Sequence, residues 1–267
     1  MFRTITNAAD PEMAPYRRVG DAPALERDGL FVAEGRLVVE RLLADRRFRV
    51  HSAAVTPAAA AALAGVFEGR PEIPVHVCDP GVLEAVTGFD FHRGCLALAW
   101  RDAPVPPLDA LTRVPRLLAL EGVGNPDNIG GLFRAALAFD VGAVLLDPST
   151  ADPLYRKAIR TSMGATLRVP FLRVPQWPSG LDAMRDHGCR ILALTPHADA
   201  FPLDQLRVSP DDRLVLAVGS EGSGLSDELL RYADERVRIP VNLRADSLNV
   251  VVAAGIALHA LSAGESR

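Results

Sequence analysis

Three polar stretches in the second half of this 267-residue chain carry residue types that can do chemistry. The first is 125–134 (NPDNIGGLFR), in which Asn128 and Arg134 are six residues apart, close to two helical turns if both lie on one helix. An arginine suits a phosphate or a carboxylate through its planar guanidinium. In the second, 219–224 (GSEGSG), Glu221 lies between glycines and can accept hydrogen bonds from a ligand or from Arg134. The third, 247–249 (SLN), ends on Asn249.

Each stretch also has a purely structural interpretation. Pro126 and Asp127 supply turn chemistry and an N-cap where a strand turns into a helix. Glycines are common between a strand and a helix, and Ser247 suits the N-cap of the last helix. Three features are explained less well in this way. Two glycines in a first helical turn predict a close approach to the backbone. Glu221 is either a merely solvated carboxylate or an acceptor for a ligand or Arg134. An amide at Asn249 facing a core costs about 1–3 kcal/mol without partners.

Alternating strands and helices are expected to position these stretches. The pattern predicts a strand over Arg213–Val218 before the glycine-rich loop and a helix over Leu225–Ala233 after it. A strand over Arg236–Val241 and a helix over Val250–Leu261, apolar on nearly every side, follow. This layout places two loops side by side at one edge of a parallel sheet, where ligands of α/β proteins bind.

The rest of the second half shows the same alternation, which predicts a mostly parallel sheet covered on both faces. The expected strands are Arg116–Val123, Val141–Leu146, Thr166–Val174 and Ile191–Leu194, and the expected helices are Leu132–Phe139, Tyr155–Met163 and Ser179–His187.

The first half predicts a smaller α/β unit. An irregular lead-in of about twenty residues precedes a helical pattern that opens at Leu30–Gly35. The expected strands are Val50–Val55, Ile73–Cys78 and Cys95–Trp100, and the expected helices begin at Pro57 and cover Pro80–Thr87. Because prolines concentrate between Asp102 and Pro115, the predicted organisation is a domain over 1–104, a linker over 105–115 and a domain over 116–267.

Composition narrows the class of protein. Hydrophobic residues make up 49% and charged residues 23%, which is ordinary for a soluble α/β protein. The sequence has neither an apolar stretch of membrane-spanning length nor a signal peptide, so we expect a cytoplasmic protein without a membrane partner. Cys78, Cys95 and Cys189 are far apart without a CxxC pair, and the histidines are scattered. A disulfide framework and a metal site are therefore not expected.

The net charge of −4 means that a nucleic-acid partner would have to be held by a local basic patch. One candidate is the set of arginines Arg36, Arg41, Arg46, Arg47 and Arg49, which is equally well interpreted as a solvated helix face balanced by acidic neighbours. Lys157 is the only lysine, so nearly all positive charge is arginine and a single arginine says little.

Taken together, NPDNIGGLFRAA, VGSEGSGLS and IPVNLRADSLNVVVAAGIAL resemble the three motifs of the SpoU (TrmH-like) RNA 2′-O-methyltransferases of the SPOUT superfamily. The resemblance covers Leu117 to Leu261, and 155–164 (YRKAIRTSMG) also matches a stretch of this family. The N-terminal part, with FVAEGRLVVERLL, is similar to the L30e-like substrate-binding domain that many members carry.

The resemblance implies a SPOUT-type parallel sheet with a C-terminal trefoil knot. Such knots are rare, because protein chains do not normally thread through their own loops. It also implies a homodimer that binds S-adenosylmethionine in the knot. By position in the motifs, Gly219, Ile239 and Leu248 contact the cofactor, with the Thr195 loop nearby. The same comparison makes Arg134 the catalytic arginine, supported by Asn128 and Glu221, with Ser247 and Asn249 completing the pocket.

The expected function is S-adenosylmethionine-dependent methylation of a ribose 2′-hydroxyl, in ribosomal RNA because the extra N-terminal domain suits a structured target. A tRNA target and a non-catalytic RNA-binding factor are the alternatives. A nucleotide-binding dehydrogenase would need an early GxGxxG after the first strand, and none is present. The sequence leaves open whether Arg134 acts as a general base or as an electrostatic clamp.

Overall fold

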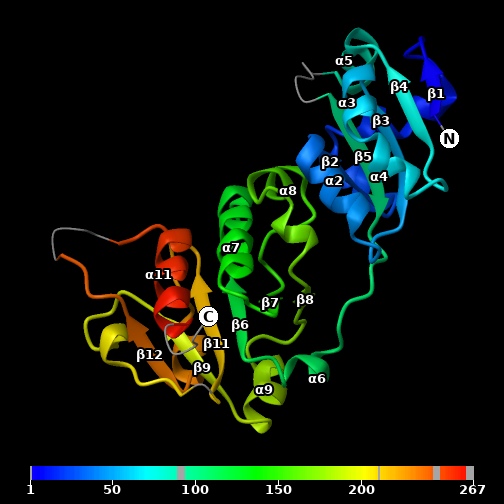
Figure 1. Cartoon of the computed structure of the whole chain (residues 1–267). Helices are drawn as coiled ribbons and strands as arrows, with labels where there is room; N and C mark the ends of the chain where they lie inside the picture. The colour runs from blue at the N-terminus through cyan, green and yellow to red at the C-terminus, as the bar shows by residue number, and fades with distance from the viewer. Residues whose placement is uncertain (1, 89–93, 210, 243–246, 263–267) are drawn as a thin grey trace. The chain divides into compact units, whose positions relative to one another are not determined.

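The computed structural model describes residues 2–88, 94–209, 211–242 and 247–262. The chain divides into two compact units, Met1–Pro104 with Pro153–Leu167 and Val105–Asp152 with Arg168–Arg267 (Figure 1). The N-terminal unit thus includes a segment from the middle of the sequence. The division into domains over 1–104 and 116–267 with a linker over 105–115 stays a prediction. The two divisions differ at Pro153–Leu167 and at 105–115, which belongs to the second unit and contains a short helix, Leu108–Leu111.

The N-terminal unit contains a mixed five-stranded sheet in the order β1-β4-β3-β5-β2. Strands β1, β4 and β3 are parallel, and β5 is antiparallel to β3 and β2. The strands are β1 (Phe2–Ile5), β2 (Leu30–Glu34), β3 (Val50–Val55), β4 (Val75–Cys78) and β5 (Cys95–Trp100). The helices are α1 (Ala22–Arg27), α2 (Arg36–Ala44), α3 (Pro57–Ala62), α4 (Ala64–Glu68), α5 (Pro80–Thr87) and, from the later segment, α8 (Arg156–Thr161).

Two predictions for this unit were wrong. Leu30–Glu34 is not helical but forms strand β2, with all five residues buried. A short apolar run without alternation cannot be distinguished from a buried helix by periodicity, and the helix begins only after Gly35, at Arg36. The irregular lead-in contains β1 and α1. Strand β1 lies at the sheet edge with three of its four residues exposed, so it lacks an apolar pattern.

The C-terminal unit contains a seven-stranded, entirely parallel sheet in the order β10-β12-β9-β11-β6-β7-β8. Its strands are β6 (Arg116–Glu121), β7 (Ala143–Leu146), β8 (Phe171–Arg173), β9 (Cys189–Leu194), β10 (Phe201–Pro202), β11 (Arg213–Gly219) and β12 (Glu235–Arg238). Its helices are α6 (Leu108–Leu111), α7 (Pro126–Ala138), α9 (Asp182–Asp186), α10 (Asp227–Tyr232) and α11 (Val250–Ser262).

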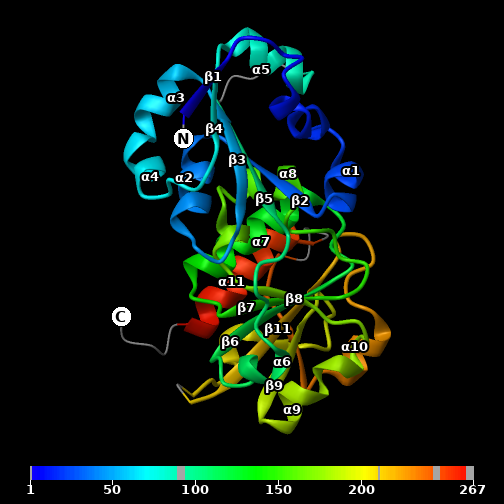
Figure 2. The same ribbon diagram turned by 90° about the vertical axis from the view of Figure 1, so that its right-hand side faces the viewer.

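Helices cover both faces of this sheet, as the alternation predicts. Helices α7 and α11 pack against each other on one face, and α6, α9 and α10 lie on the other (Figure 2). Alternate strand residues such as Leu117, Ala119, Val215 and Ala217 pack against the second group of helices. The predicted strand over Thr166–Val174 is shorter than expected, because Ala165–Leu167 is a 3-10 helix and only Phe171–Arg173 pairs with β7.

The trefoil knot stays a prediction, because residues 243–246 of the connection from β12 to α11 lie outside the described residues. The L30e-like character of the N-terminal unit also stays a prediction. No helix in the described part of the chain is long and apolar enough to span a bilayer.

Candidate functional site

The carboxyl edge of the seven-stranded sheet contains a topological switch point. Strands β6 and β11 are neighbours in the middle of the sheet. From β6 the chain continues through β7 and β8 to one edge, whereas β9 and β12 lie on the other side of β11. Loops that leave neighbouring strands in opposite directions create a crevice, which is where open α/β sheets bind ligands. The residues that follow Glu121 and Gly219 lie at this switch point, because these two residues pair at the ends of β6 and β11.

Helix α7 begins at this edge, earlier than predicted. Asn125 is its N-cap and accepts a 2.9 Å hydrogen bond from the backbone N–H of Asp127, with Pro126 at the first helical position. The helix therefore starts at Pro126, not at Leu132, and Asn125 caps it in place of Asp127. Asn128 and Arg134 do share the helix, but six residues rotate by about 600°, so their side chains point roughly 120° apart. Accordingly Asn128 is 7% exposed, and Arg134 is exposed.

One amide joins three segments of the chain. Nδ2 of Asn249, which directly precedes α11, donates a 3.2 Å hydrogen bond to Oδ1 of Asn128 in α7. The same Nδ2 donates to Oε1 of Glu221 in the glycine-rich loop after β11. We call Asn128, Glu221 and Asn249 the amide cluster. It unites one residue from each of the three polar stretches that the sequence singled out.

Asn249 also caps α11. Its Oδ1 accepts hydrogen bonds from the backbone N–H groups of Val251, at 2.9 Å, and Val252, at 3.4 Å. The prediction that Ser247 caps this helix is therefore wrong, since Ser247 lies outside it. Asn249 does not face a core, either: it is exposed, and its partners are at the sheet edge. Because the cap uses the amide oxygen, both N–H groups are left for Asn128 and Glu221.

Gly131 of α7 allows helix–helix contact. A Cβ added at Gly131 would lie 2.7 and 2.8 Å from the two Cγ atoms of Val251 in α11. The close approach that the sequence predicted at this point is therefore made by α11 and not by a ligand. Packing of α7 against α11 places Asn128 within reach of Asn249.

The glycine-rich loop folds tightly over the end of β11. A Cβ at Gly219 would lie 2.1 Å from the backbone carbon of Gly224, so only glycine fits there. Gly224 has a φ of 69° and donates from its N–H to the carbonyl of Ser220 at 3.0 Å. The hydroxyls of Ser220 and Ser223 are 2.9 Å apart. This closed loop presents Glu221 to the amide cluster.

Two acidic residues at strand ends were not identified from the sequence. Glu121 ends β6, and its carboxylate accepts hydrogen bonds from Trp177 and Ser226. Asp147, directly after β7, is buried and accepts from the N–H groups of Gly122 and Thr150 and from the hydroxyl of Ser149. Burial by itself would raise the pKa of Asp147, but these hydrogen bonds outweigh it and hold the pKa below its usual value. For Asp147 the available signal was an acidic residue directly after a predicted strand, whereas Glu121 lies inside the strand predicted over Arg116–Val123 and carried no such signal.

The other predicted site residues lie near the same edge without joining the amide cluster by hydrogen bonds. Thr195 follows β9 and is buried, and its N–H donates to the carbonyl of Val237 at 2.9 Å. Ile239 directly follows β12, and Leu248 precedes Asn249; both are half-buried. Thus Thr195, Gly219 and Ile239 mark the carboxyl ends of three adjacent strands, β9, β11 and β12. Arg134 makes no hydrogen bond or ion pair within the described residues.

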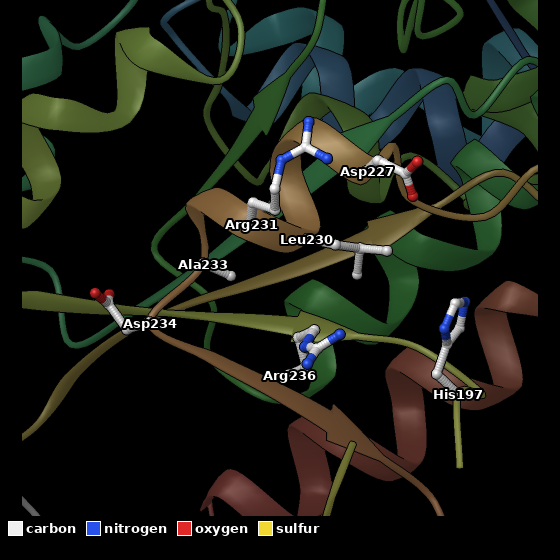
Figure 3. A pocket seen from close by; sticks show the side chains of 7 residues that line it. All are labelled: His197, Asp227, Leu230, Arg231, Ala233, Asp234 and Arg236. Atoms are coloured by element: carbon white, nitrogen blue, oxygen red, sulfur yellow. The ribbon is translucent and has the colours of Figure 1, made fainter. Parts of the chain in front are cut away.

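A cavity of about 400 Å³ lies on the α10 side of the sheet (Figure 3). It is lined by His197, Asp227, Leu230, Arg231, Ala233, Asp234 and Arg236, and it contains no predicted site residue. Arg236 forms an ion pair with Asp199 at 3.2 Å. The lining mixes acidic and basic groups, so its charge selects no class of ligand. Across the described residues, no group of three or more potential metal ligands comes together.

These features define an α/β protein in which three polar segments meet at the switch point of a parallel sheet. Residues 115–259, more than half of the chain, match the model of the SpoU rRNA Methylase family. An uncharacterised tRNA/rRNA methyltransferase of Mycobacterium tuberculosis is 40% identical over 259 residues, which cover 94% of this chain and 88% of that protein. The chain belongs to the SpoU rRNA methylase family and is an RNA methyltransferase of that family.

Solved structures agree with the fold over nearly the whole chain. An rRNA methyltransferase from Sinorhizobium meliloti, crystallised with AdoMet bound, superposes with a TM-score of 0.81 at 23% identity and covers 97% of both chains. An RNA 2′-O ribose methyltransferase superposes with a TM-score of 0.75 at 27% identity and covers 98% of this chain and 99% of the other. The similarity therefore extends over both units.

Proposed function

We propose that this protein transfers the methyl group of S-adenosylmethionine to a ribose 2′-hydroxyl of ribosomal RNA. The observation that carries the proposal is the amide cluster: Asn128, Glu221 and Asn249 come from the three motifs and meet at the switch point of the sheet. The similarity to an RNA 2′-O ribose methyltransferase at 27% identity supports the same position of transfer.

The chemistry of the edge fits S-adenosylmethionine. Ile239 and Leu248 are half-buried apolar side chains that would pack against the adenine ring. Gly219 and the Thr195 loop offer backbone groups at the ends of neighbouring strands. The carboxylate of Glu221 complements the positive charge of a sulfonium. When bound, the cofactor supplies an activated methyl group for in-line transfer.

The residues of the chain have to align the acceptor and receive its proton. The S–CH₃ bond breaks as the O–CH₃ bond forms, and the 2′-hydroxyl proton leaves to solvent or to a base, giving S-adenosylhomocysteine and 2′-O-methyl RNA. Holding the acceptor oxygen behind the methyl group provides much of the rate. In this proposal the amide cluster and Ser247 shape the pocket around the reacting atoms.

Arg134 is proposed as the catalytic arginine. Its side chain is exposed and free of hydrogen bonds and ion pairs within the described residues, so it is available to RNA. Because arginine essentially never deprotonates in proteins, we assign it the role of a clamp. It would hold the phosphate next to the target ribose and stabilise the developing alkoxide.

The proposal also covers the RNA-binding module, the oligomeric state and the compartment of the protein. The N-terminal unit is the RNA-binding module, and its presence favours structured ribosomal RNA over tRNA. The protein is a homodimer, since α11 exposes Val252 and Ile256, which are 50% and 42% accessible in the single chain. The cytoplasm, where ribosomal RNA is found, is its compartment.

The proposal is tested by transfer of a radiolabelled methyl group from S-adenosylmethionine to purified ribosomal RNA and, separately, to tRNA. Label should enter the ribosomal RNA and survive as an alkali-resistant dinucleotide, the signature of 2′-O-methylation. Arg134→Ala should lower the transfer rate on the order of 10²- to 10³-fold, as expected for loss of an electrostatic stabiliser.

Three results would contradict parts of the proposal. Label in tRNA alone would make tRNA the substrate. Label in an alkali-sensitive position would place the methyl group on a base. If wild type bound RNA but transferred no more label than Arg134→Ala does, the protein would be a non-catalytic RNA-binding factor.

A further inference from the structure

Glu121 occupies the switch point of the sheet, yet it belongs to none of the three motifs. It is the last residue of β6 and pairs in register with Gly219, the last residue of β11. Its half-buried carboxylate lies beside the loop that carries Glu221.

The carboxylate of Glu121 accepts three hydrogen bonds. Oε1 accepts from the indole Nε1 of Trp177 and from the hydroxyl of Ser226, both at 2.8 Å. Oε2 accepts from the backbone N–H of Ser226 at 2.7 Å. Ser226 is therefore held through both its backbone and its side chain.

The direction of the Ser226 proton follows from its second contact. Ser226 is the N-cap of α10, and its Oγ accepts a 3.1 Å hydrogen bond from the N–H of Leu229. A hydroxyl has one proton, so with an acceptor role toward Leu229 that proton goes to Glu121. The cap of α10 and the contact to Glu121 thus support each other.

Both ends of the glycine-rich loop depend on the same strand. Gly219 is fixed to β6 by the parallel ladder at Glu121, and Ser226 is fixed by the carboxylate of that residue. The six residues between them, 220–225, include Glu221, which accepts from Asn249 in the amide cluster. The length and closure of this loop set the position of Glu221.

We propose that Glu121 is a positioning residue for methyl transfer: through Ser226 it holds the loop that presents Gly219 to the cofactor and Glu221 to the amide cluster. This inference rests on the proposed function of that site. Glu121 touches neither the cofactor nor the RNA in this account.

Glu121→Gln is the sharpest substitution, because it keeps size and shape. All three groups facing the carboxylate are donors, whereas an amide offers one oxygen and an NH₂ group. In either orientation the NH₂ group faces a donor, so the loop must move. A misplacement of about 1 Å lowers rates on the order of 10²-fold. We expect the cofactor kcat/KM to fall roughly 10- to 100-fold, and affinity for S-adenosylhomocysteine to weaken, while the KM for RNA stays near the wild-type value.

Glu228→Gln is the matched control. Glu228 lies two residues beyond Ser226 on α10, is exposed and makes no hydrogen bond or ion pair within the described residues. This variant removes the same charge nearby and should bind and turn over like wild type. Ser226→Ala and the double variant with Glu121→Gln complete a cycle. If Glu121 acts through Ser226, the double variant should lose no more cofactor affinity and rate than the more impaired of the two single variants.

The test is calorimetry with S-adenosylhomocysteine, methyl-transfer kinetics and thermal unfolding of all variants. Weaker cofactor binding and a slower rate for Glu121→Gln alongside an unaffected Glu228→Gln support the inference. A lower melting temperature with unchanged affinity and rate would show that Glu121 is merely structural, and wild-type behaviour of Glu121→Gln would also overturn the inference. If wild type itself neither binds the cofactor nor methylates RNA, the proposed function fails first and this inference with it.

Discussion

The side chain of Asn249 donates a 3.2 Å hydrogen bond from Nδ2 to Oδ1 of Asn128, which lies 121 residues earlier in the chain. Nδ2 also donates to Glu221, and Oδ1 of the same amide caps α11. One side chain thus fixes the starts of two helices relative to the glycine-rich loop. Its two functions, capping and joining, can be separated experimentally.

Asn249→Ala and Asn249→Ser should differ in stability but not in binding. Serine is as good an N-cap as asparagine, whereas alanine costs about 1 kcal/mol at this position. Neither replacement can donate to both Asn128 and Glu221. We therefore expect urea unfolding to distinguish the variants, and calorimetry to show weakened S-adenosylhomocysteine binding in both, with RNA affinity less affected. If Asn249→Ser bound S-adenosylhomocysteine with wild-type affinity, the amide cluster would not be part of the cofactor site.

Gly131→Ala should destabilise the protein even though alanine is the better helix former. Helix propensity favours alanine by about 1 kcal/mol, but the new Cβ would lie 2.7 Å from Val251. Overpacking of this kind costs typically 1–3 kcal/mol, so the net free energy of unfolding should fall. Val251→Ala should restore part of it in the double variant.

Gly255→Ala provides the matched comparison for Gly131→Ala. Gly255 lies inside α11 with open space at its Cβ position, so alanine there should stabilise or leave stability unchanged. Chemical unfolding curves of both variants give the change in unfolding free energy relative to wild type. Equal stability changes at the two glycines would mean that α7 and α11 do not pack as described.

Asp147→Asn should show a pH-dependent loss of stability. The pKa of Asp147 is lowered below 3.8 in the folded protein, so the folded state favours the ionised carboxylate. Its contribution is therefore present above about pH 3.8 and is lost as the pH falls through the lower folded-state pKa. An amide cannot accept from Gly122, Ser149 and Thr150 together, which costs about 1–3 kcal/mol.

The pH dependence is measured by urea unfolding of wild type and Asp147→Asn, at pH 7 and at several pH values below 4. The difference in unfolding free energy between the two proteins should be largest at neutral pH and should shrink in acid. A difference that is constant with pH would show that ionisation of Asp147 contributes nothing.

Charge reversal at Arg36 and Arg46 decides whether the arginines of the N-terminal unit face RNA. Within the described residues Arg36 and Arg46 make no hydrogen bond or ion pair, whereas Arg41, Arg47 and Arg49 bond to Met163, Asp45 and Asp102 respectively. If the patch contacts phosphates, Arg36→Glu with Arg46→Glu should weaken RNA binding and reduce its salt dependence by about one unit per lost contact.

Arg27→Glu is the control for this charge reversal. Arg27 is exposed on α1, across the five-stranded sheet from α2 (Figure 2). RNA titrations at several salt concentrations compare wild type, the double variant Arg36→Glu with Arg46→Glu, and Arg27→Glu. If the double variant binds RNA like wild type, the interpretation of this surface as a solvated helix face holds instead.

Ile256→Asp should convert a dimer into monomers. Val252 and Ile256 are four residues apart on α11 and therefore lie on one face of the helix. A charge in the centre of a buried apolar contact is strongly unfavourable. Light scattering should report the mass of two chains for wild type and of one for Ile256→Asp. Val105→Asp, at an exposed apolar residue outside α11, should leave the mass unchanged. A monomeric wild type would contradict the proposal.

Much of the fold follows from local patterns. Pro80–Thr87 and Cys95–Trp100 have the predicted bounds, because a proline start and an unbroken apolar run fix each element locally. The prediction of a helical pattern at Leu30–Glu34 was wrong because a strand buried on both faces has no alternation that distinguishes it from a helix. Helix α7 was placed six residues late because Gly130 and Gly131 argue against a helix, and the packing of α11 against Gly131 is not visible in the local sequence.

The sequence by itself determined which residues are candidates for the site: Asn128, Glu221 and Asn249 are polar residues between apolar runs, and the resemblance of their motifs to the SpoU family groups them. Only the tertiary structure decided how they are used. Asn249 rather than Ser247 caps α11, Val251 rather than a ligand approaches Gly131, and Glu121 holds the loop of Glu221. Hydrogen bonds over more than a hundred residues depend on which strands are neighbours in the sheet, and local sequence does not contain that order.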